Sequence, residues 1–394
     1  MPIAGEVAII GTGTIKFGEN FRQDYNAMLK EACEKAFADA GVDKKAIQAG
    51  WLGTYLPFSW GYEGASGVNV TDTLGLGPIP VTRVSNYCST GMEAVRNAAM
   101  SIAAKEYDLV LAVGVEKMRD VSGRGSLVAQ HVERGHPLYC KGRTAPGMFA
   151  LLANRYFKEY GINEETLAKV AVKNHHHGAM NPNAHFRSEI TAEKALAAPY
   201  VASPLKLFDC CPTTDGAAAA ILCPVEKAKE YTDNYVVIKG AALSITGGYY
   251  TAQMDPDFTF TGFPSTQEAS KEAYRQAGVK DPLKEVDVVE LHDCFTITEI
   301  INYEDLGFAK KGEGWKLIEE GETYIGGKIP VNPSGGLKSC GHPVGASGVR
   351  MINDISDQLR GRADKRQVKD AKLGVAHTLG GPGALACVFV LGAP

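Results

Sequence analysis

The pattern of apolar and polar positions predicts strands and helices in regular alternation. The stretch Ile79–Val84 is rich in β-branched residues, as strands are. Apolar residues then recur at helical spacing, at Met92, Val95, Ala99, Met100 and Ile102. A helix is therefore expected to begin near Ser89. Cys88 lies at this junction, beside the unpaired N–H groups of a first helical turn, where the helix dipole favours a thiolate and lowers the pKa of a cysteine. A small buried thiol is the alternative interpretation.

The pattern occurs twice along the chain. EKAFADAGVD (from Glu34) matches KEAYRQAGVK (from Lys271), and each predicted helix ends at a glycine and precedes a strand candidate. Those strand candidates are Ile47–Tyr55 and Val286–Leu291. A second pair of helices opens on the related triplets STG and ASG, each followed by a charged loop and an apolar strand. The duplication predicts two similar α/β halves.

The domain boundaries follow from where the duplication is interrupted. Residues 1–117 and 202–229 are expected to form the N-terminal half, and residues 230–394 the C-terminal half. Between them, residues 118–201 are rich in His, Asn, Arg and Met, and we expect this insertion to cover the site and contact the substrate.

Composition excludes several classes of function. The 394 residues are 45% hydrophobic with a net charge of −4, which is typical of a globular protein and gives no basic surface for nucleic acid. No apolar run is long enough to span a bilayer, and the amino terminus lacks a signal-peptide pattern, so we expect a cytoplasmic protein. The nine cysteines contain no CxxC pair and are expected to be free thiols without a metal. In IIGTGTIKFG, Lys16 occupies the third glycine position of a dinucleotide-binding loop, so that function is rejected.

Three stretches of the second half place reactive side chains at strand ends. LHDCF puts His292 and Cys294 after a strand, and NPSGGLKSCGHPVGASG puts His342 in a glycine-rich loop before a helix. AHTLGGPGA puts His377 at the end of the penultimate strand. Because α/β folds collect their chemistry at strand ends, we expect these loops to converge on Cys88.

The motifs NxCSTG, HDCF and NPSGGxxxxGHPxGASG and the closing glycine turn, in this order, resemble the thiolase family. The HDCF motif is most similar to its sterol-carrier-protein-x and archaeal-type branch. The likeness extends over essentially the whole chain. It implies the five-layer αβαβα fold, duplicated and with an inserted loop domain, which agrees with the duplication.

The resemblance also implies a role for each reactive residue. Cys88 is expected to accept the acyl group, and His342 to take the proton of its thiol. Cys294 matches the second, acid/base cysteine of this branch, and His292 is expected to hold the thioester oxygen. Coenzyme A then serves as cosubstrate, and no prosthetic group is needed.

Secondary roles are expected at the other glycine-rich turn and in the insertion. The backbone N–H of Cys88 and one from Leu379–Gly380 are expected to form an oxyanion hole. His377 either orients Cys88 or fills the pocket. Substrate contacts are expected from the insertion, at Arg143, His177 and Arg187.

Three functions remain open at this stage. The first is a thiolase that cleaves acetoacetyl-CoA or a branched or aryl 3-oxoacyl-CoA such as benzoylsuccinyl-CoA. The second is a decarboxylating ketoacyl synthase, for which Cys294 would have no use. The third is a catalytically silent acyl-CoA- or lipid-binding subunit. The resemblance further implies a homodimer or larger assembly and possible pairing with a small zinc-ribbon/OB-fold partner.

Overall fold

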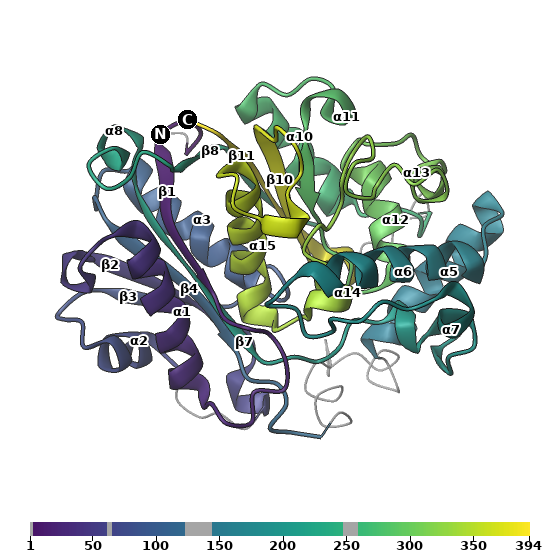
Figure 1. Ribbon diagram of the computed structural model, residues 1–394, viewed down its shortest axis with the longest axis horizontal. Coiled ribbons are helices and arrows are strands. Elements are labelled where there is room, and N and C mark those ends of the chain that lie inside the picture. The colour runs from purple at the N-terminus through teal and green to yellow at the C-terminus, as the bar shows by residue number, and fades with distance from the viewer. Residues whose placement is uncertain (1–2, 61–64, 123–143, 247–258) are drawn as a thin grey trace.

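The computed structural model describes residues 3–60, 65–122, 144–246 and 259–394 (Figure 1). Its centre is a nine-stranded sheet in the order β3-β2-β4-β7-β1-β8-β11-β10-β9. The N-terminal half contributes β1 (Val7–Thr14), α1 (Tyr25–Ala40), β2 (Ala49–Gly53), α2 (Gly67–Leu74), β3 (Val81–Val84), α3 (Thr90–Ala103), β4 (Val110–Glu116) and β7 (Gly216–Pro224). The C-terminal half contributes β8 (Val236–Ile245), α10 (Pro264–Ala277), β9 (Val288–Glu290), α15 (Val344–Leu359), β10 (Leu373–Gly380) and β11 (Leu385–Gly392).

The two halves repeat one topology, as the sequence predicted. In the first half the strands lie in the order β3-β2-β4-β7-β1, and in the second they lie in the corresponding order β9-β10-β11-β8. A parallel bridge from Val331 to Val289 occupies the place of the missing fifth strand. The halves join through the pairing of β1 with β8, at Ala8–Val237 and Ile9–Val236.

The duplicated helix ends are confirmed in detail. α1 ends at Gly41 (φ 66°), whose N–H bonds the carbonyl of Phe37, and α10 ends at Gly278 (φ 76°), whose N–H bonds the carbonyl of Tyr274. In both helices a left-handed glycine terminates the last turn, because a side chain there would be strained.

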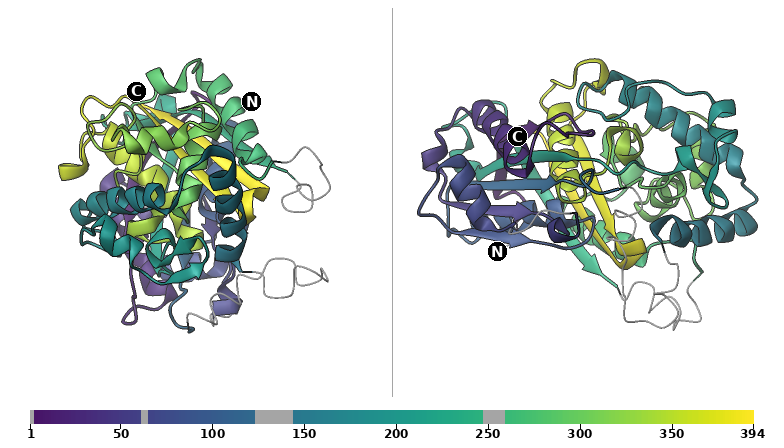
Figure 2. Two further views of the ribbon diagram at one scale, coloured as in Figure 1. Left: turned by 90° about the vertical axis from the view of Figure 1, so that its right-hand side faces the viewer. Right: turned by 90° about the horizontal axis from the view of Figure 1, so that it is seen from below.

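The layers follow the predicted five-layer arrangement (Figure 2). α1 packs on β1, β4 and β7 of the first half, and α10 packs on β8 and β11 of the second. α3 and α15 pack against each other between the halves, and α15 contacts strands of both. A Cβ at Gly91 would lie 2.4 Å from the carbonyl oxygen of Gly345, and a Cβ at Gly348 would lie 2.3 Å from the backbone nitrogen of Met92. Glycine therefore permits the close crossing that brings the two helix N-termini together.

The insertion contains α5 (Ala145–Tyr160), α6 (Glu164–Met180), α7 (Ala192–Leu196) and the hairpin of β5 (Tyr200–Ala202) with β6 (Leu205–Lys206). It packs on shorter helices of the second half, including α12 (Thr296–Asp305), α13 (Gly314–Glu319) and α14 (Gly336–Cys340). The predicted boundary at 201/202 falls inside the hairpin. The chain returns to the large sheet only at Gly216, so the insertion extends further than the sequence indicated.

The remaining short helices lie in the connections. They are α8 (Val225–Ala228), α11 (Pro282–Glu285) and α16 (Gly381–Ala384). Among the described residues, no helix combines the length and the apolar character needed to cross a membrane.

Candidate active site

One cavity of about 90 Å³ collects the reactive residues of both halves. It is lined by Cys88 from the first half and by His292, Cys294 and His342 from the second. Potential ligand atoms of Cys88, His292 and His342 all lie within 4.8 Å of one another. The structure thus brings together four side chains that are up to 254 residues apart in the sequence (342 − 88).

Cys88 stands on a tight, locked turn between β3 and α3. Tyr87, the residue before it, has a positive φ of 45°, which is rare for a non-glycine residue and common at functional sites. The turn is held by Thr90, whose hydroxyl accepts the N–H of Asn86 at 2.7 Å and donates to the carbonyl of Tyr87 at 2.6 Å. These bonds hold the Cys88 backbone in place, and its side chain keeps part of its surface open to the cavity.

The expected lowering of the Cys88 pKa is wrong for the protein at rest. Burial raises the pKa of this thiol to about 12, and the nearby carboxylate of Glu116 adds to the rise. A hydrogen bond from the backbone lowers the pKa without offsetting burial. The sequence pattern identified the helix start correctly but could not show how little solvent reaches the sulfur. Cys88 is therefore a neutral thiol until a base removes its proton.

His342 is placed to be that base. Its Nδ1 lies 2.7 Å from the hydroxyl of Ser347, and that hydroxyl donates to the carbonyl of Pro343 at 2.9 Å. Because the hydroxyl has only one proton, it accepts from Nδ1–H of His342, which leaves Nε2 as a free lone pair. This Nε2 is buried and has no hydrogen-bond partner among the described residues. Burial and Arg350 lower the pKa of His342 to about 3, so the ring is neutral and able to accept a proton.

Replacement of Ser347 by alanine tests this assignment. The change leaves Nδ1–H of His342 without its acceptor and allows the other tautomer, so we expect kcat to fall about tenfold, in line with ~1–3 kcal/mol for an unsatisfied buried donor. Steady-state kinetics of the variant measure the loss. Ser356→Ala is the matched control, because Ser356 is buried on the same helix and makes the same kind of bond to the carbonyl of Ile352. Equal losses in both variants would contradict the assignment.

His292 is held by its backbone and presents its ring to the cavity. Its carbonyl accepts the side-chain amide of Asn302 at 3.0 Å, and its N–H points to Nδ1 of His377 at 3.4 Å. Burial and the neighbouring histidines lower the pKa of His292 well below the usual range, so the ring is neutral. Its plane stands at 86° to the ring of His342, with ring centroids 5.2 Å apart.

His377 does not line the cavity. Besides His292, it contacts the hydroxyl of Thr266 through Nε2 at 3.1 Å, and it is fully buried. Because His377 does not line the cavity, it does not fill the pocket, and a role in orienting Cys88 stays a prediction. It accepts the main-chain N–H of His292.

Cys294 shares the cavity wall with a third thiol, Cys211, to which the sequence motifs assign no role. Cys211 donates its N–H to the carbonyl of Cys294 at 2.9 Å. Burial raises the pKa of Cys294 well above its ordinary value, and the nearby thiols and Asp293 add to the rise. Cys294 is therefore protonated at rest, as an acid must be.

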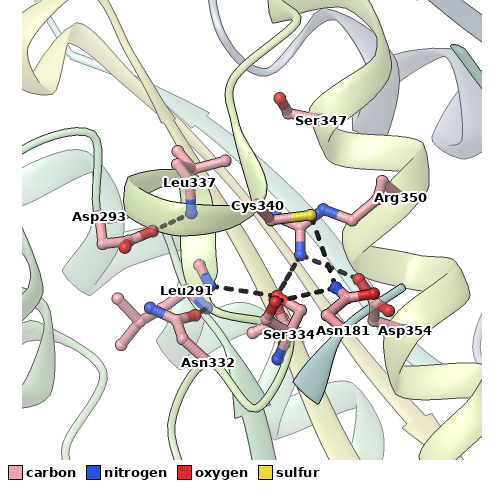
Figure 3. Close-up of polar contacts among 12 residues, drawn as sticks. Asn181, Leu291, Asp293, Asn332, Ser334, Leu337, Cys340, Ser347, Arg350 and Asp354 are labelled. Atoms are coloured by element: carbon pink, nitrogen blue, oxygen red, sulfur yellow. Dashed lines mark hydrogen bonds and ion pairs between the residues drawn. The ribbon is translucent and has the colours of Figure 1, made fainter. Parts of the chain in front are cut away.

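A buried polar network links the segments that lead to His292 and His342 (Figure 3). Asp293 accepts the N–H of Leu337 at 2.6 Å and so fixes the start of α14, which leads to His342. Arg350 bonds Glu290 at 2.6 Å, the hydroxyl of Ser334 at 2.6 Å and Asp354 at 2.9 Å. The buried guanidinium of Arg350 is thus paired with two carboxylates, as a buried charge requires.

Leu379 and Gly380 reach the site as predicted. Both line the cavity at the end of β10. A Cβ at Gly380 would lie 2.9 Å from the Cβ of Tyr87 and 3.2 Å from the backbone nitrogen of Cys88. The absence of a side chain at Gly380 thus allows the backbone of this turn to approach the nucleophile.

The expected substrate contacts from the insertion fare differently. His177 is buried, donates from Nδ1 to the carbonyl of Asn332 at 3.0 Å and accepts the N–H of Ile325 at Nε2 at 3.3 Å. Both ring nitrogens are thus engaged with backbone away from the cavity, so the geometry does not fit the predicted contact. Arg187 is exposed and borders a separate surface cleft with Asp364 and Lys365, so its contact with substrate stays a prediction. Arg143 lies outside the described residues.

Sequence reasoning missed several residues of the cavity. These are Tyr55, Tyr87, Thr144, Ala145, Met148, Phe149, Phe295, Val344 and Gly381. Most are apolar residues without a chemical signature. Ser347, which does not line the cavity, could have been found from the sequence, because it lies one helical turn after the loop that carries His342.

Comparisons with known proteins agree with the fold and the motifs. The family descriptions "Thiolase, N-terminal domain" and "Thiolase C-terminal domain-like" match residues 7–226 and 248–393. An acetyl-CoA acetyltransferase of Methanothermobacter thermautotrophicus is 40% identical, covering 98% of this chain and 99% of the relative. Sterol carrier protein 2 of Oryctolagus cuniculus is 34% identical, covering 98% of this chain and 72% of the relative. Benzoylsuccinyl-CoA thiolase subunit BbsB of Thauera aromatica is 32% identical, covering 97% and 96%.

Solved structures show the same fold. The Ltp2-ChsH2(DUF35) aldolase superposes with a TM-score of 0.85 at 26% identity, covering 100% of this chain and 99% of that one. Human mitochondrial 3-ketoacyl-CoA thiolase in complex with CoA superposes with a TM-score of 0.74 at 18% identity, with the same coverage.

Proposed function

The chain belongs to the thiolase family, and we propose that it cleaves a 3-oxoacyl-CoA with coenzyme A through an acyl-enzyme on Cys88. As a member of this family it is an acyltransferase that uses CoA as a substrate and needs no metal or other cofactor. The observation that carries the proposal is the cavity that unites Cys88, His342, His292 and Cys294.

In the first half-reaction, Nε2 of His342 takes the thiol proton as the Cys88 sulfur attacks the 3-oxo carbon. Neutral donors aimed at the resulting oxyanion stabilise it, and removal of such a donor typically costs about 3–4 kcal/mol. The backbone N–H of Cys88 and the turn at Leu379–Gly380 are the donors that we assign. Collapse of the adduct breaks the C2–C3 bond and leaves the acyl group on Cys88 and an enolate of the departing thioester.

The enolate needs a proton at carbon and a donor at oxygen. Cys294 supplies the proton, which agrees with its raised pKa, and His292 stabilises the enolate oxygen as a neutral donor. The proton held by His342 then restores the Cys294 thiol. Coenzyme A next gives its own thiol proton to the neutral His342 and takes the acyl group, and His342 passes this proton to the departing Cys88 sulfur, which regenerates the Cys88 thiol. In the reverse direction, deprotonated Cys294 abstracts the α-proton of an acyl-CoA. A ketoacyl synthase generates its carbanion by decarboxylation of the substrate and does not need this thiol. The presence of Cys294 therefore favours thiolase activity over synthase activity.

The proposed substrate is acetoacetyl-CoA or a branched or aryl 3-oxoacyl-CoA. Many of the described walls of the cavity are apolar or aromatic, which suits an apolar acyl group. Phe149 of the insertion stacks at 4.7 Å on Phe295, which follows Cys294 in the sequence. BbsB belongs to a thiolase that by its name acts on benzoylsuccinyl-CoA, which supports a branched or aryl acyl group as a candidate.

Replacement of Phe149 by alanine should widen this wall. We expect the ratio of kcat/KM for a long-chain or aryl 3-oxoacyl-CoA to that for acetoacetyl-CoA to rise about tenfold, within the range for one pocket contact. Thiolysis assays over a panel of 3-oxoacyl-CoAs measure the ratio. Phe157→Ala is the control, since Phe157 lies on the same helix but does not line the cavity. An unchanged ratio would contradict the assignment.

A partner protein belongs to the proposal as well. BbsB is by name a subunit, and the aldolase neighbour carries a DUF35 component in its name. We propose that this chain forms at least a homodimer and pairs with a small zinc-ribbon/OB-fold protein. Light scattering of the purified chain, alone and with a co-expressed small subunit, measures the assembly. A stable, fully active monomer would contradict it.

The test of the function combines catalysis with detection of the intermediate. The chain, with and without any small subunit, is assayed for thiolysis of 3-oxoacyl-CoAs from acetoacetyl to aryl-substituted. Intact-mass measurement after exposure to an acyl-CoA should then find one acyl group on Cys88. Absence of both turnover and adduct would favour the silent subunit.

A further inference from the structure

Glu116, the last residue of β4, is a fully buried carboxylate that faces three segments around the nucleophile. Its Oε2 accepts the N–H of Tyr55 at 2.8 Å and the N–H of Gly345 at 2.8 Å. Its Oε1 accepts the hydroxyl of Thr54 at 3.2 Å, and the N–H of Leu56 also bonds the carboxylate. No ion pair to Glu116 is found in the described part of the chain, so these donors alone compensate its burial.

The bound N–H groups belong to segments that contact Cys88 directly. Cys88 packs in a small apolar cluster with Tyr55, Leu56, Met118 and Val344. Tyr55 and Leu56 follow β2, whereas Val344 begins α15 two residues after His342. The carboxylate thus holds both sides of the pocket at once.

The start of α15 depends on this contact. The helix has no side-chain cap of its own at Pro343, so its first N–H groups need acceptors from elsewhere. A Cβ at Gly345 would lie 2.6 Å from the carbonyl oxygen of Val115, 2.7 Å from that of Gly53 and 2.8 Å from Oε2 of Glu116. Glycine at position 345 therefore lets the helix of one half sit against the strand ends of the other, with Glu116 as its cap.

We propose that Glu116 is a positioning residue of the reaction, which clamps the Tyr55 loop and the first turn of α15 together and thereby sets His342 against Cys88. The proposal rests on the proposed role of Cys88. Glu116 does not line the cavity, so it acts through these neighbours and not on the substrate.

The charge of Glu116 has a second consequence for Cys88. An ionised carboxylate beside the sulfur opposes formation of a thiolate, and it adds to the raised pKa of Cys88. Burial raises the pKa of Glu116 itself to about 8, against its hydrogen bonds, so the effect is strongest in alkaline solution. The other titratable groups near Cys88 are Tyr55, Tyr87, Cys211, His292, Cys294 and His342. Of these, the two histidines are neutral, and Tyr55 and the thiols are protonated.

Two substitutions separate the clamp from the charge. The amide of Glu116→Gln can still accept the N–H groups of Tyr55 and Gly345 and donate to Thr54, whereas Glu116→Ala removes every bond. We expect kcat to fall about 100-fold in Glu116→Ala, because misplacement of a catalytic group by about 1 Å typically has this effect. KM should change by less than about threefold. Glu116→Gln should retain at least about a tenth of the wild-type kcat. Ser356→Ala, which removes a buried hydroxyl of α15 that bonds the carbonyl of Ile352 and not Glu116, is the control with near wild-type kcat.

A chemical readout that needs no turnover accompanies the kinetics. The rate at which iodoacetamide alkylates Cys88, located by peptide mass, is measured from pH 7 to pH 10. At pH 9, Glu116→Gln should be alkylated about threefold faster than the wild type, since no carboxylate opposes the thiolate. A purely structural role would lower the melting temperature without moving this profile.

Two results would overturn the proposal. One is a folded Glu116→Ala variant that keeps more than about a third of the wild-type kcat. The other is a Glu116→Gln profile that coincides with the wild type over the whole pH range. Because alkylation reports on Cys88 even in a protein without thiolase activity, failure of this inference is distinguishable from failure of the proposed function.

Discussion

Replacing Cys88 by alanine should reduce thiolysis by about 10⁴-fold or more and abolish the acyl adduct. The expectation follows from the loss of the only group that we assign to accept the acyl chain, since loss of a nucleophile from a coupled catalytic set removes nearly all of the set's effect. Thiolysis of the best 3-oxoacyl-CoA and intact-mass measurement after incubation with acyl-CoA give the two readouts. The fold should survive, because Cys88 makes few of the contacts that hold its turn; those belong to Thr90.

Cys210→Ala is the control for this experiment. Cys210 is a partly exposed thiol close in sequence to Cys211, and it does not line the cavity. We expect the Cys210→Ala variant to keep its turnover and to form the acyl adduct on Cys88. An adduct that persists in Cys88→Ala, carried by Cys211 or Cys294, would show that the nucleophile had been assigned to the wrong sulfur.

Replacing Cys294 by alanine should separate the two half-reactions. Carbon–carbon cleavage and condensation should fall by about 10²–10⁴-fold, the usual contribution of a positioned acid/base. Transfer of an acyl group from a simple acyl-CoA to Cys88 should continue, because that step needs no proton at carbon. Exchange of deuterium from water into the methyl group of acetyl-CoA measures the lost function directly, and mass analysis measures the retained one.

The same variant decides between the two condensing reactions. A ketoacyl synthase generates its carbanion by decarboxylation and does not need Cys294. If Cys294→Ala kept full condensing activity with malonyl thioesters, the synthase would replace the thiolase as the function. Thr298→Val is a useful companion, since its hydroxyl lies 4.0 Å from the Cys294 sulfur and tunes that thiol without removing it.

The fold was largely predictable, and the reason is the duplication. Two helices with the same sequence pattern end at Gly41 and Gly278 in the same left-handed geometry. Helix termination depends on local sequence, so each copy ends its helix independently of the other. Agreement between the two copies therefore supports the prediction that the halves share one topology. The end of the insertion was less predictable, because the hairpin around residue 202 has no counterpart in the other half.

The candidate site was predictable where its residues carry a motif. Cys88, His292, Cys294 and His342 stand in short sequence patterns, and all four line one cavity. Glu116 and Cys211 carry no such pattern, and only packing reveals that they surround the same sulfur. His177 carries no such motif, and its geometry does not fit the predicted substrate contact, because both ring nitrogens bond backbone groups.

The sequence by itself determined which elements form, that the halves repeat, and which side chains are the candidates for nucleophile, base and acid, because propensity, spacing and motif are local properties. The tertiary structure alone decided the ionisation of those groups. The Cys88 pKa, expected to fall at a helix start, is raised instead, since burial and a carboxylate from another strand outweigh the helix dipole. The pKa of a side chain depends on its access to solvent and on charged groups that are distant in the sequence. Both are defined only in the folded chain.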